Sequence, residues 1–257
     1  MDGNDANDAS DGSLPRFTMT DAYCHLDMEQ ESPIADIERR MATAAVSSAL
    51  LVETWDGRNR PLLEDLLREG PTDRFSVALC YRRELPPHLN GSGLAAVRMS
   101  TQDIHRDNDF CREVYQSGKM LVTHAEAGVG PLSVELSRLY DRLPEIRVYI
   151  PHLGWPVREG KADGKWAAAV KEFAAIPSLT IGVSAIAHFS NEPFPHNDVR
   201  DFALGMISQF PASRIAIGSD YPLFEKERYA GYISLARDWV TSIHSNWSYR
   251  WKTDDSF

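Results

Sequence analysis

The stretch MLVTHAEAGVGPLSVELSRLYDRLPEIRVYIPHL, residues 120–153, contains one complete strand–helix–strand unit. Its apolar, β-branched runs 120–125 and 147–153 predict two strands, and the amphipathic segment 131–143 between them predicts a helix. Pro131 stands where the first turn of a helix tolerates proline. A crossover helix between successive strands indicates that the two strands run parallel.

The same alternation of strands and helices continues along the body of the chain. Strands are predicted at residues 21–26, 48–54, 75–81, 94–99, 120–125, 147–153, 179–184 and 214–219. Helices are predicted at residues 34–45, 61–70, 131–143, 166–175, 198–210 and 230–243. Eight such units predict an α/β fold, a distorted (β/α)8 TIM-like barrel. The connection 82–93 contains Pro86 and Pro87, so we expect the third helix to be short or missing.

Composition and charge define the class of protein and its partners. The chain has 257 residues, 43% of them hydrophobic, which predicts a single globular domain at 17–257 after a flexible acidic tail at 1–16. The net charge of −10 argues against nucleic acid and anionic membranes as partners and leaves a small-molecule substrate. No secretory signal is recognised, so we expect a cytoplasmic location. Aromatic residues near the C-terminus make a homodimer reasonable.

Polar and aromatic side chains collect where the predicted strands end. In a parallel barrel, catalytic groups come from these carboxyl ends and the loops that follow. Residues two apart on a strand face the same side, so Tyr23 shares a face with His25, and His124 with Glu126. We therefore expect one site at the mouth of the barrel. The residues at these positions are Tyr23, His25, Glu53, Trp55, Tyr81, Arg82, Arg98, Ser100, His124, Glu126, His152, Ser184 and Asp220.

Four motifs at these strand ends resemble the amidohydrolase superfamily, and within it the amidohydrolase-related group of lactonases and decarboxylases. They are TDAYCHLD (residues 20–27), VTHAEAG (122–128), IPHLGWP (150–156) and IGSDYP (217–222). The resemblance implies that His124, His152 and Asp220 are catalytic, with the aspartate acting as general base on the attacking water. Members of this family end their first strand in His-x-His. Here Tyr23 replaces the first histidine and only His25 remains.

The resemblance leaves two possibilities for a cofactor. One divalent metal, zinc or manganese, would use His25, His124 and Asp220 as ligands, with Tyr23 or Glu126 as a further oxygen donor. A phenol is a poorer ligand than imidazole at neutral pH because its pKa lies near 10. Some lactonases of this group work without a metal, and their histidines and an arginine polarise the ester carbonyl.

The favoured function is hydrolysis of a lactone, or of a related C–O or C–N bond, in a small anionic substrate. Asp220 would activate water with help from His152, and His25 and His124 would stabilise the oxyanion. Tyr23 would be a new general acid or a product of drift. Arg98 matches an arginine that meets a substrate carboxylate in relatives. Further substrate contacts are expected from Glu126, Tyr81, Arg82 and Trp55.

Two alternatives remain open at this point. The same site would suit non-oxidative decarboxylation of an unsaturated or aromatic acid, a branch of the family that generally uses a metal. A barrel that binds a ligand without catalysis is the other alternative, because resemblance of fold does not establish activity. Release of carbon dioxide would identify the first alternative, and ligand binding without turnover the second.

Overall fold

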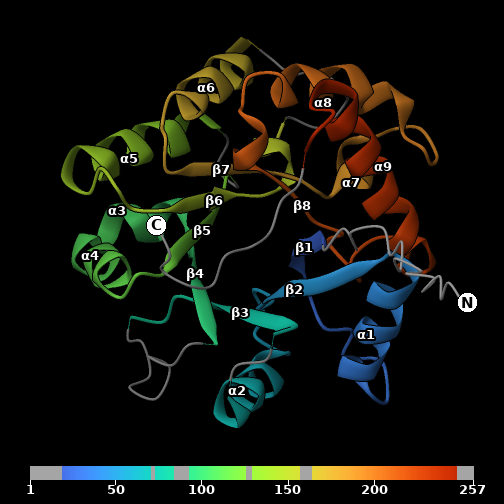
Figure 1. Ribbon diagram of the computed structural model, residues 1–257. Helices are drawn as coiled ribbons and strands as arrows, with labels where there is room; N and C mark the ends of the chain where they lie inside the picture. Colours follow the sequence, from blue (N-terminus) through green and yellow to red (C-terminus); the bar gives the residue numbers. More distant parts are fainter. Residues whose placement is uncertain (1–18, 71–72, 84–92, 126–128, 157–163, 248–257) are drawn as a thin grey trace, which may run out of the picture.

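The computed structural model describes residues 19–70, 73–83, 93–125, 129–156 and 164–247. Its strands form one sheet in the order β1-β2-β3-β4-β5-β6-β7-β8, and each neighbouring pair is parallel. Figure 1 shows the strands at the centre of the molecule with the helices around them. The predicted TIM-like barrel is confirmed. The strands are β1 (Met19–Cys24), β2 (Val46–Val52), β3 (Phe75–Cys80), β4 (Leu94–Ser100), β5 (Met120–His124), β6 (Val148–Ile150), β7 (Leu179–Val183) and β8 (Ile215–Ile217).

Helices between the strands cover the outside of the barrel. A short helix, α7 (Ile186–Phe189), follows β7. Within the described residues, no helix combines the length and the apolar character that crossing a membrane requires. All six helices predicted from the sequence are present, with ends within three residues of the prediction: α1 (Pro33–Thr43), α2 (Arg60–Glu69), α5 (Val129–Arg142), α6 (Gly164–Ala174), α8 (Arg200–Ile207) and α9 (Tyr229–Ile243).

Two helices that the sequence analysis did not predict, α3 (Thr101–Arg106) and α4 (Asn108–Gln116), lie between β4 and β5. Ser100 and Asp103 form a capping box at the start of α3, a pattern that fixes a helix N-terminus. Asp107 then accepts a hydrogen bond of 3.0 Å from the main chain of Phe110 and begins α4. α3 has six residues, too few for an apolar periodicity to identify it, whereas α4 has nine and buries Phe110 and Val114 on one face, a pattern that the sequence analysis did not use.

Some of the sequence predictions fall on residues outside the described part of the chain. Residues 84–92, which form most of the connection between β3 and β4, belong to this group, and so does the acidic segment 1–16. A short or missing third helix and a flexible tail therefore stay predictions.

The strands β6 and β8 have three residues each, fewer than the predicted strands 147–153 and 214–219. Pro151 has no main-chain N–H and ends β6. His152, Leu153, Gly154 and Trp155 follow with φ values of 59°, 55°, 68° and 56°, which makes a left-handed turn. The predicted ends of both strands were therefore wrong, and His152 and Asp220 lie in turns after their strands.

The interior of the barrel is filled by alanines, by larger aliphatic side chains such as Leu50 and Val52, and by two tyrosine rings. Tyr23 and Tyr149 are completely buried there among several alanines, of which Ala22 and Ala216 come from the first and last strands. A much larger apolar layer lies between the strands and the helices. The alanines leave the space at the barrel axis that the two rings occupy.

The first and last strands close the barrel through hydrogen bonds at their carboxyl ends. The main-chain N–H of Asp220 donates to the Tyr23 carbonyl at 2.9 Å, and that of His25 donates to the Tyr221 carbonyl at 2.6 Å. The buried Asp21 carboxylate accepts from the main-chain N–H and the hydroxyl of Ser219 at 2.9 and 2.7 Å. We call this set of contacts the β1–β8 seam.

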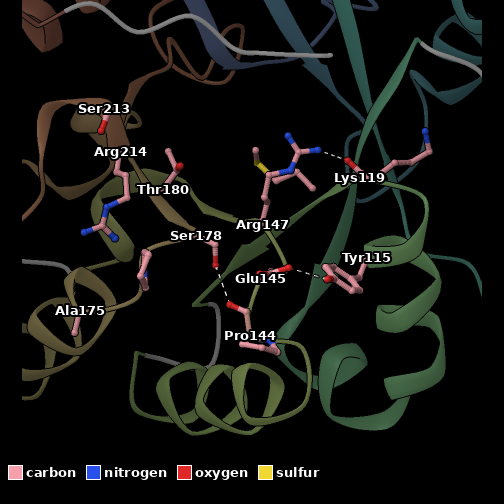
Figure 2. A pocket seen from close by; sticks show the side chains of 13 residues that line it. Tyr115, Lys119, Pro144, Glu145, Arg147, Ala175, Ser178, Thr180, Ser213 and Arg214 are labelled. Atoms are coloured by element: carbon pink, nitrogen blue, oxygen red, sulfur yellow. Dashed lines mark hydrogen bonds between the residues drawn. The ribbon is translucent and has the colours of Figure 1, made fainter. Parts of the chain in front are cut away.

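A cavity of about 1170 Å³ lies at the opposite, amino-terminal end of the strands (Figure 2). Arg147 donates to the Gly118 carbonyl beside it, and Arg214 donates to the carbonyls of Ile176, Leu179 and Ala174. These basic side chains therefore tie the loops that precede β5, β7 and β8 to their surroundings. None of the site residues predicted from the sequence lines this cavity.

We expect Gly218→Ala to destabilise the protein, because Gly218 allows the close approach of β8 to β1. A Cβ at this position would lie 2.7 Å from the Tyr23 Cβ and 3.1 Å from its main-chain N and O. Such overpacking costs roughly 1–3 kcal/mol of unfolding free energy, which urea denaturation measures. Gly205→Ala is the control: it lies in α8 with nothing within 4 Å of a new Cβ, so it should gain roughly 0.5–1 kcal/mol. Equal stability of the two variants would contradict the tight seam.

Candidate active site

Four aromatic rings and one carboxylate meet at the carboxyl end of the barrel. Tyr23 and His25 come from β1 and the residue after it, His124 ends β5, and His152 and Asp220 follow β6 and β8. The Tyr23 ring centroid lies 5.3 Å from that of His25 and 4.6 Å from that of His152, and the His124 and His152 centroids are 4.8 Å apart. All five side chains are buried. The structure thus brings together the residues that the strand-end pattern selected.

Tyr23 contacts His124 directly. Its hydroxyl lies 2.8 Å from His124 Nε2, within hydrogen-bond distance. The tyrosine ring stands inside the barrel and is completely buried. The phenol that replaces the first histidine of the motif therefore occupies the centre of the cluster and pairs with an imidazole.

The Asp220 carboxylate lies between two imidazoles. Its Oδ1 is 3.7 Å from His25 Nε2 and 3.9 Å from His152 Nε2. Both distances are too long for a direct hydrogen bond. Oδ1 is buried and has no hydrogen-bond partner among the described residues. Asp220 has a φ of 57°, and the seam holds its main chain against Tyr23.

The hydrogen bond of His25 with the main chain identifies its tautomer. His25 Nδ1 lies 2.8 Å from the Val52 carbonyl oxygen. A carbonyl only accepts, so Nδ1 carries a proton and the neutral ring has an unprotonated Nε2. That nitrogen faces Asp220. His25 therefore presents a hydrogen-bond acceptor to the carboxylate, which does not match the oxyanion role expected from the sequence.

Burial keeps two of the histidines uncharged at neutral pH. Desolvation, reinforced by the Arg98 charge, holds the pKa of His124 well below its ordinary value. Desolvation lowers the pKa of His152 to about 4, although the Asp220 charge opposes this shift. Both rings are consequently neutral at pH 7, where each offers one N–H donor and one acceptor nitrogen.

Arg98 is a buried cation beside this cluster. Its guanidinium donates to the Glu53 carbonyl at 2.7 Å, and its Cζ lies 3.9 Å from the centroid of the Trp55 ring. Nε has no hydrogen-bond partner among the described residues, and none of their carboxylates lies within 4.0 Å of the guanidinium. Burying a charge without a counter-ion is costly. Arg98 is therefore suited to receive an anion.

Two tryptophans form walls around His124. The Trp155 ring stacks on His124 with centroids 6.0 Å apart, and the half-exposed Trp55 meets it edge-on at 5.9 Å. The sequence motif on β6 places Trp155 three residues after His152, at the mouth of the barrel.

Two predicted substrate contacts do not join the cluster, and a third lies outside the described residues. The Tyr81 hydroxyl donates to Asp107, and its ring packs on Phe110 with centroids 4.7 Å apart, so this side chain points towards α4. Arg82 is half-exposed and donates to the Glu53 carboxylate at 2.7 Å. Glu126 lies outside the described residues.

Glu53, which the sequence analysis placed at the mouth without a specific role, is fully buried beneath it. Its carboxylate binds Arg60 at 3.1 Å, Arg82 at 2.7 Å and the main-chain N–H of Cys80 at 2.7 Å. Its carbonyl holds Arg98. Glu53 therefore anchors the basic side chains on this side of the barrel. Only its position after β2 in the sequence suggested such a role.

The residues of the cluster do not fit a divalent metal. The ligand set implied by the resemblance needs the lone pair of His124, but the Tyr23 hydroxyl lies 2.8 Å from Nε2 of that ring. In the described ranges, His, Cys, Asp and Glu side chains form no group of three or more with spacing suited to a metal ion. Tyr23 thus stands where relatives would place a nitrogen ligand.

Comparison with known proteins places the chain in a family. The sequence profile described as amidohydrolase matches residues 18–241, most of the chain. A search of curated proteins finds no significant match.

Several solved structures share the fold. A Pseudomonas putida protein proposed to be a 2-pyrone-4,6-dicarboxylic acid hydrolase superposes with a TM-score of 0.70 at 17% identity, over 87% of this chain and 90% of that chain. An Acinetobacter baumannii protein proposed to have the same activity, with citric acid bound, gives 0.67 at 16% identity, over 88% and 94%. A Burkholderia multivorans amidohydrolase with bound HEPES gives 0.65 at 18% identity, over 88% and 92%.

The lowered pKa of His152 predicts a stability that falls in acid. Below pH 6.5 the unfolded chain takes up a proton on this ring, whereas the folded chain does so only near pH 4. Unfolding free energy should therefore decrease from pH 7 to pH 5, with about 2 kcal/mol of the loss due to His152. His152→Gln should remove that part of the pH dependence, as measured by urea denaturation at both pH values. An unchanged pH dependence in the variant would mean that the folded ring protonates normally.

Proposed function

This chain belongs to the amidohydrolase family, and from that membership we propose that it is a hydrolase for a cyclic ester or a related C–O or C–N bond. The proposed substrate is a small molecule with an anionic group. One observation carries the proposal: the buried Asp220 Oδ1, with no hydrogen-bond partner among the described residues, lies between the Nε2 atoms of His25 and His152. A carboxylate in this state can accept a proton from water.

Asp220 would act as the general base. Its distances to His25 and His152 are too long for direct hydrogen bonds but short enough for one water to bridge. The water would give one hydrogen bond to Asp220 and the other to the unprotonated His25 Nε2. Its remaining lone pair would then attack the ester carbonyl.

The remaining steps follow from the neutral groups of the cluster. Attack forms the new carbon–oxygen bond and places negative charge on the carbonyl oxygen. In the pair of Tyr23 and His124, joined at 2.8 Å, the tautomer with the proton on His124 Nε2 leaves the Tyr23 hydroxyl free to donate to that charge. The ring C–O bond then breaks, and the proton that Asp220 took from water returns to the leaving oxygen. Addition of one water to the lactone thus gives a hydroxy acid.

Arg98 would bind the anionic group of the substrate. Its buried guanidinium has no carboxylate partner in the described part of the chain, and Trp55 covers one face of it. Two of the similar structures bear names that specify hydrolysis of 2-pyrone-4,6-dicarboxylate, a cyclic ester with two carboxylates. These names support a carboxylated lactone as the first substrate to test.

The test is a survey of carboxylated and uncarboxylated lactones, with and without a chelator. Ring opening of a carboxylated lactone that persists after chelation supports the proposal. Loss of activity on chelation would show that turnover requires a metal ion, and release of carbon dioxide would identify a decarboxylase. Binding of lactones without turnover would indicate a non-catalytic barrel.

Asp220→Asn should lower kcat for the active lactone by about 100- to 10,000-fold, because an amide cannot accept the proton of water. Initial rates from the absorbance change on ring opening measure the effect. Asp238→Asn, a substitution on the exposed surface of α9, is the control and should leave the rate unchanged. Full activity of Asp220→Asn would remove this aspartate from the mechanism.

Arg98→Met should raise KM for a carboxylated lactone by about 10- to 100-fold, since a hydrogen bond to a charged group contributes roughly 1.5–3 kcal/mol. The effect on an uncarboxylated lactone should be much smaller. Thermal unfolding should show little loss of stability, because the substitution removes a buried charge that lacks a counter-ion. Arg237→Met on α9 serves as the control. An equal loss on both substrates would contradict binding of a carboxylate by Arg98.

A further inference from the structure

Ser184 lies one residue beyond β7 and is buried against His152. Its Oγ is 3.0 Å from the main-chain N of His152 and 3.0 Å from Nδ1 of the same residue. One hydroxyl therefore contacts both the main chain and the ring of a single histidine. The sequence analysis placed this serine at the mouth of the barrel but gave it no specific role.

The hydrogen bonds of Ser184 determine which nitrogen of His152 is protonated. The main-chain N–H can only donate, so Oγ accepts at that contact. The hydroxyl proton then needs an acceptor, and among the described residues His152 Nδ1 is the one within reach. A ring that accepts at Nδ1 and is neutral carries its proton on Nε2. Burial supports the neutral state, because it lowers the pKa of His152 to about 4.

The opposite arrangement holds on the other side of Asp220. His25 donates from Nδ1 to the Val52 carbonyl and leaves Nε2 unprotonated. Asp220 Oδ1 is thus flanked by the acceptor nitrogen of His25 at 3.7 Å and the N–H of His152 at 3.9 Å. The two imidazoles therefore present unlike groups to one carboxylate.

The main-chain conformation of His152 makes this anchor necessary. His152, Leu153 and Trp155 have left-handed φ values of 59°, 55° and 56°, which cost roughly 1–2 kcal/mol for each residue that is not glycine. Ser184 Oγ fixes the start of this turn through the His152 N–H, and Trp166 Nε1 donates to the Leu153 carbonyl at 3.1 Å. The contact that holds the turn is also the contact that orients the ring.

We propose that Ser184 is a positioning residue that directs the protonated Nε2 of His152 towards the reacting atoms. This inference rests on the proposed function for its catalytic consequence, but the tautomer itself does not depend on it. In the hydrolytic step, His25 and Asp220 accept the two hydrogens of the water, and the His152 N–H donates to the oxygen of the ester carbonyl. His25 and Asp220 would thereby position the water, and His152 would position the carbonyl group that the water attacks.

Nitrogen-15 NMR of the full-length protein with labelled histidine tests the tautomer directly. In the wild type at pH 7, the His152 signals, identified by their loss in His152→Gln, should show a protonated Nε2 and a hydrogen-bonded, unprotonated Nδ1. His25 should show the reverse in the same spectrum. A protonated Nδ1 on His152 would overturn the proposal. This result would stand whether or not a lactone is hydrolysed.

Kinetics of Ser184→Ala test the consequence for catalysis. We expect kcat for the active lactone to fall by about 10- to 100-fold with little change in KM, because the ring loses its orientation but the substrate contacts remain. The Nδ1 resonance of His152 should shift in the same variant. Ser184→Thr, which keeps the hydroxyl, should restore kcat, and Ser208→Ala at the exposed end of α8 is the surface control.

The two proposals fail in different ways. Wild-type kcat in Ser184→Ala would show that the serine does not position His152. Unaltered turnover in Asp220→Asn would instead refute the proposed hydrolysis, while the tautomers seen by NMR would be unaffected. A Ser184→Ala variant that loses kcat and shows a shifted Nδ1 resonance, with kcat restored in Ser184→Thr, supports the positioning role.

Discussion

The β1–β8 seam is the contact on which both the barrel and its site depend. Asp21 accepts two hydrogen bonds from Ser219 across 198 residues of sequence, and the neighbouring Asp220 N–H binds the Tyr23 carbonyl. These bonds close the ring of parallel strands. They also hold the proposed base, in the turn after β8, beside the phenol of β1, so the contacts that close the barrel also bring these two site residues together.

Burial determines the electrostatics of the site. Among the described residues, no carboxylate lies within 4.0 Å of the Arg98 guanidinium. The basic groups closest to the Asp220 carboxylate are the imidazoles of His25 and His152. His124 and His152 are held neutral by desolvation. In such a water-poor setting, charges act strongly on a bound molecule. The arrangement therefore suits a neutral ester that develops charge during reaction and carries a separate anionic group.

The sequence predicted the architecture because apolar, β-branched runs alternate with amphipathic segments, and the period of two placed Tyr23 and His25 on one face. It failed at the end of β6, where Pro151 and a left-handed turn stop the strand, and at the end of β8, which stops at Ile217. It also missed α3, which is short and begins with a capping box, and α4. Tyr81 stood at a strand end, but its bond to Asp107 turned it towards α4. Such pairings between distant side chains leave no periodic signal.

The left-handed turn at residues 152–155 sets main-chain stability against the shape of the site. Its main chain favours glycine at every position, yet only Gly154 is one. Leu153 and Trp155 adopt this conformation nevertheless, and each makes contacts that a glycine could not: Leu153 packs in the apolar layer and Trp155 stacks on His124. A glycine at position 155 would relax the main chain but remove one wall of the site. At this residue, the most stable main chain and the most complete site are therefore incompatible.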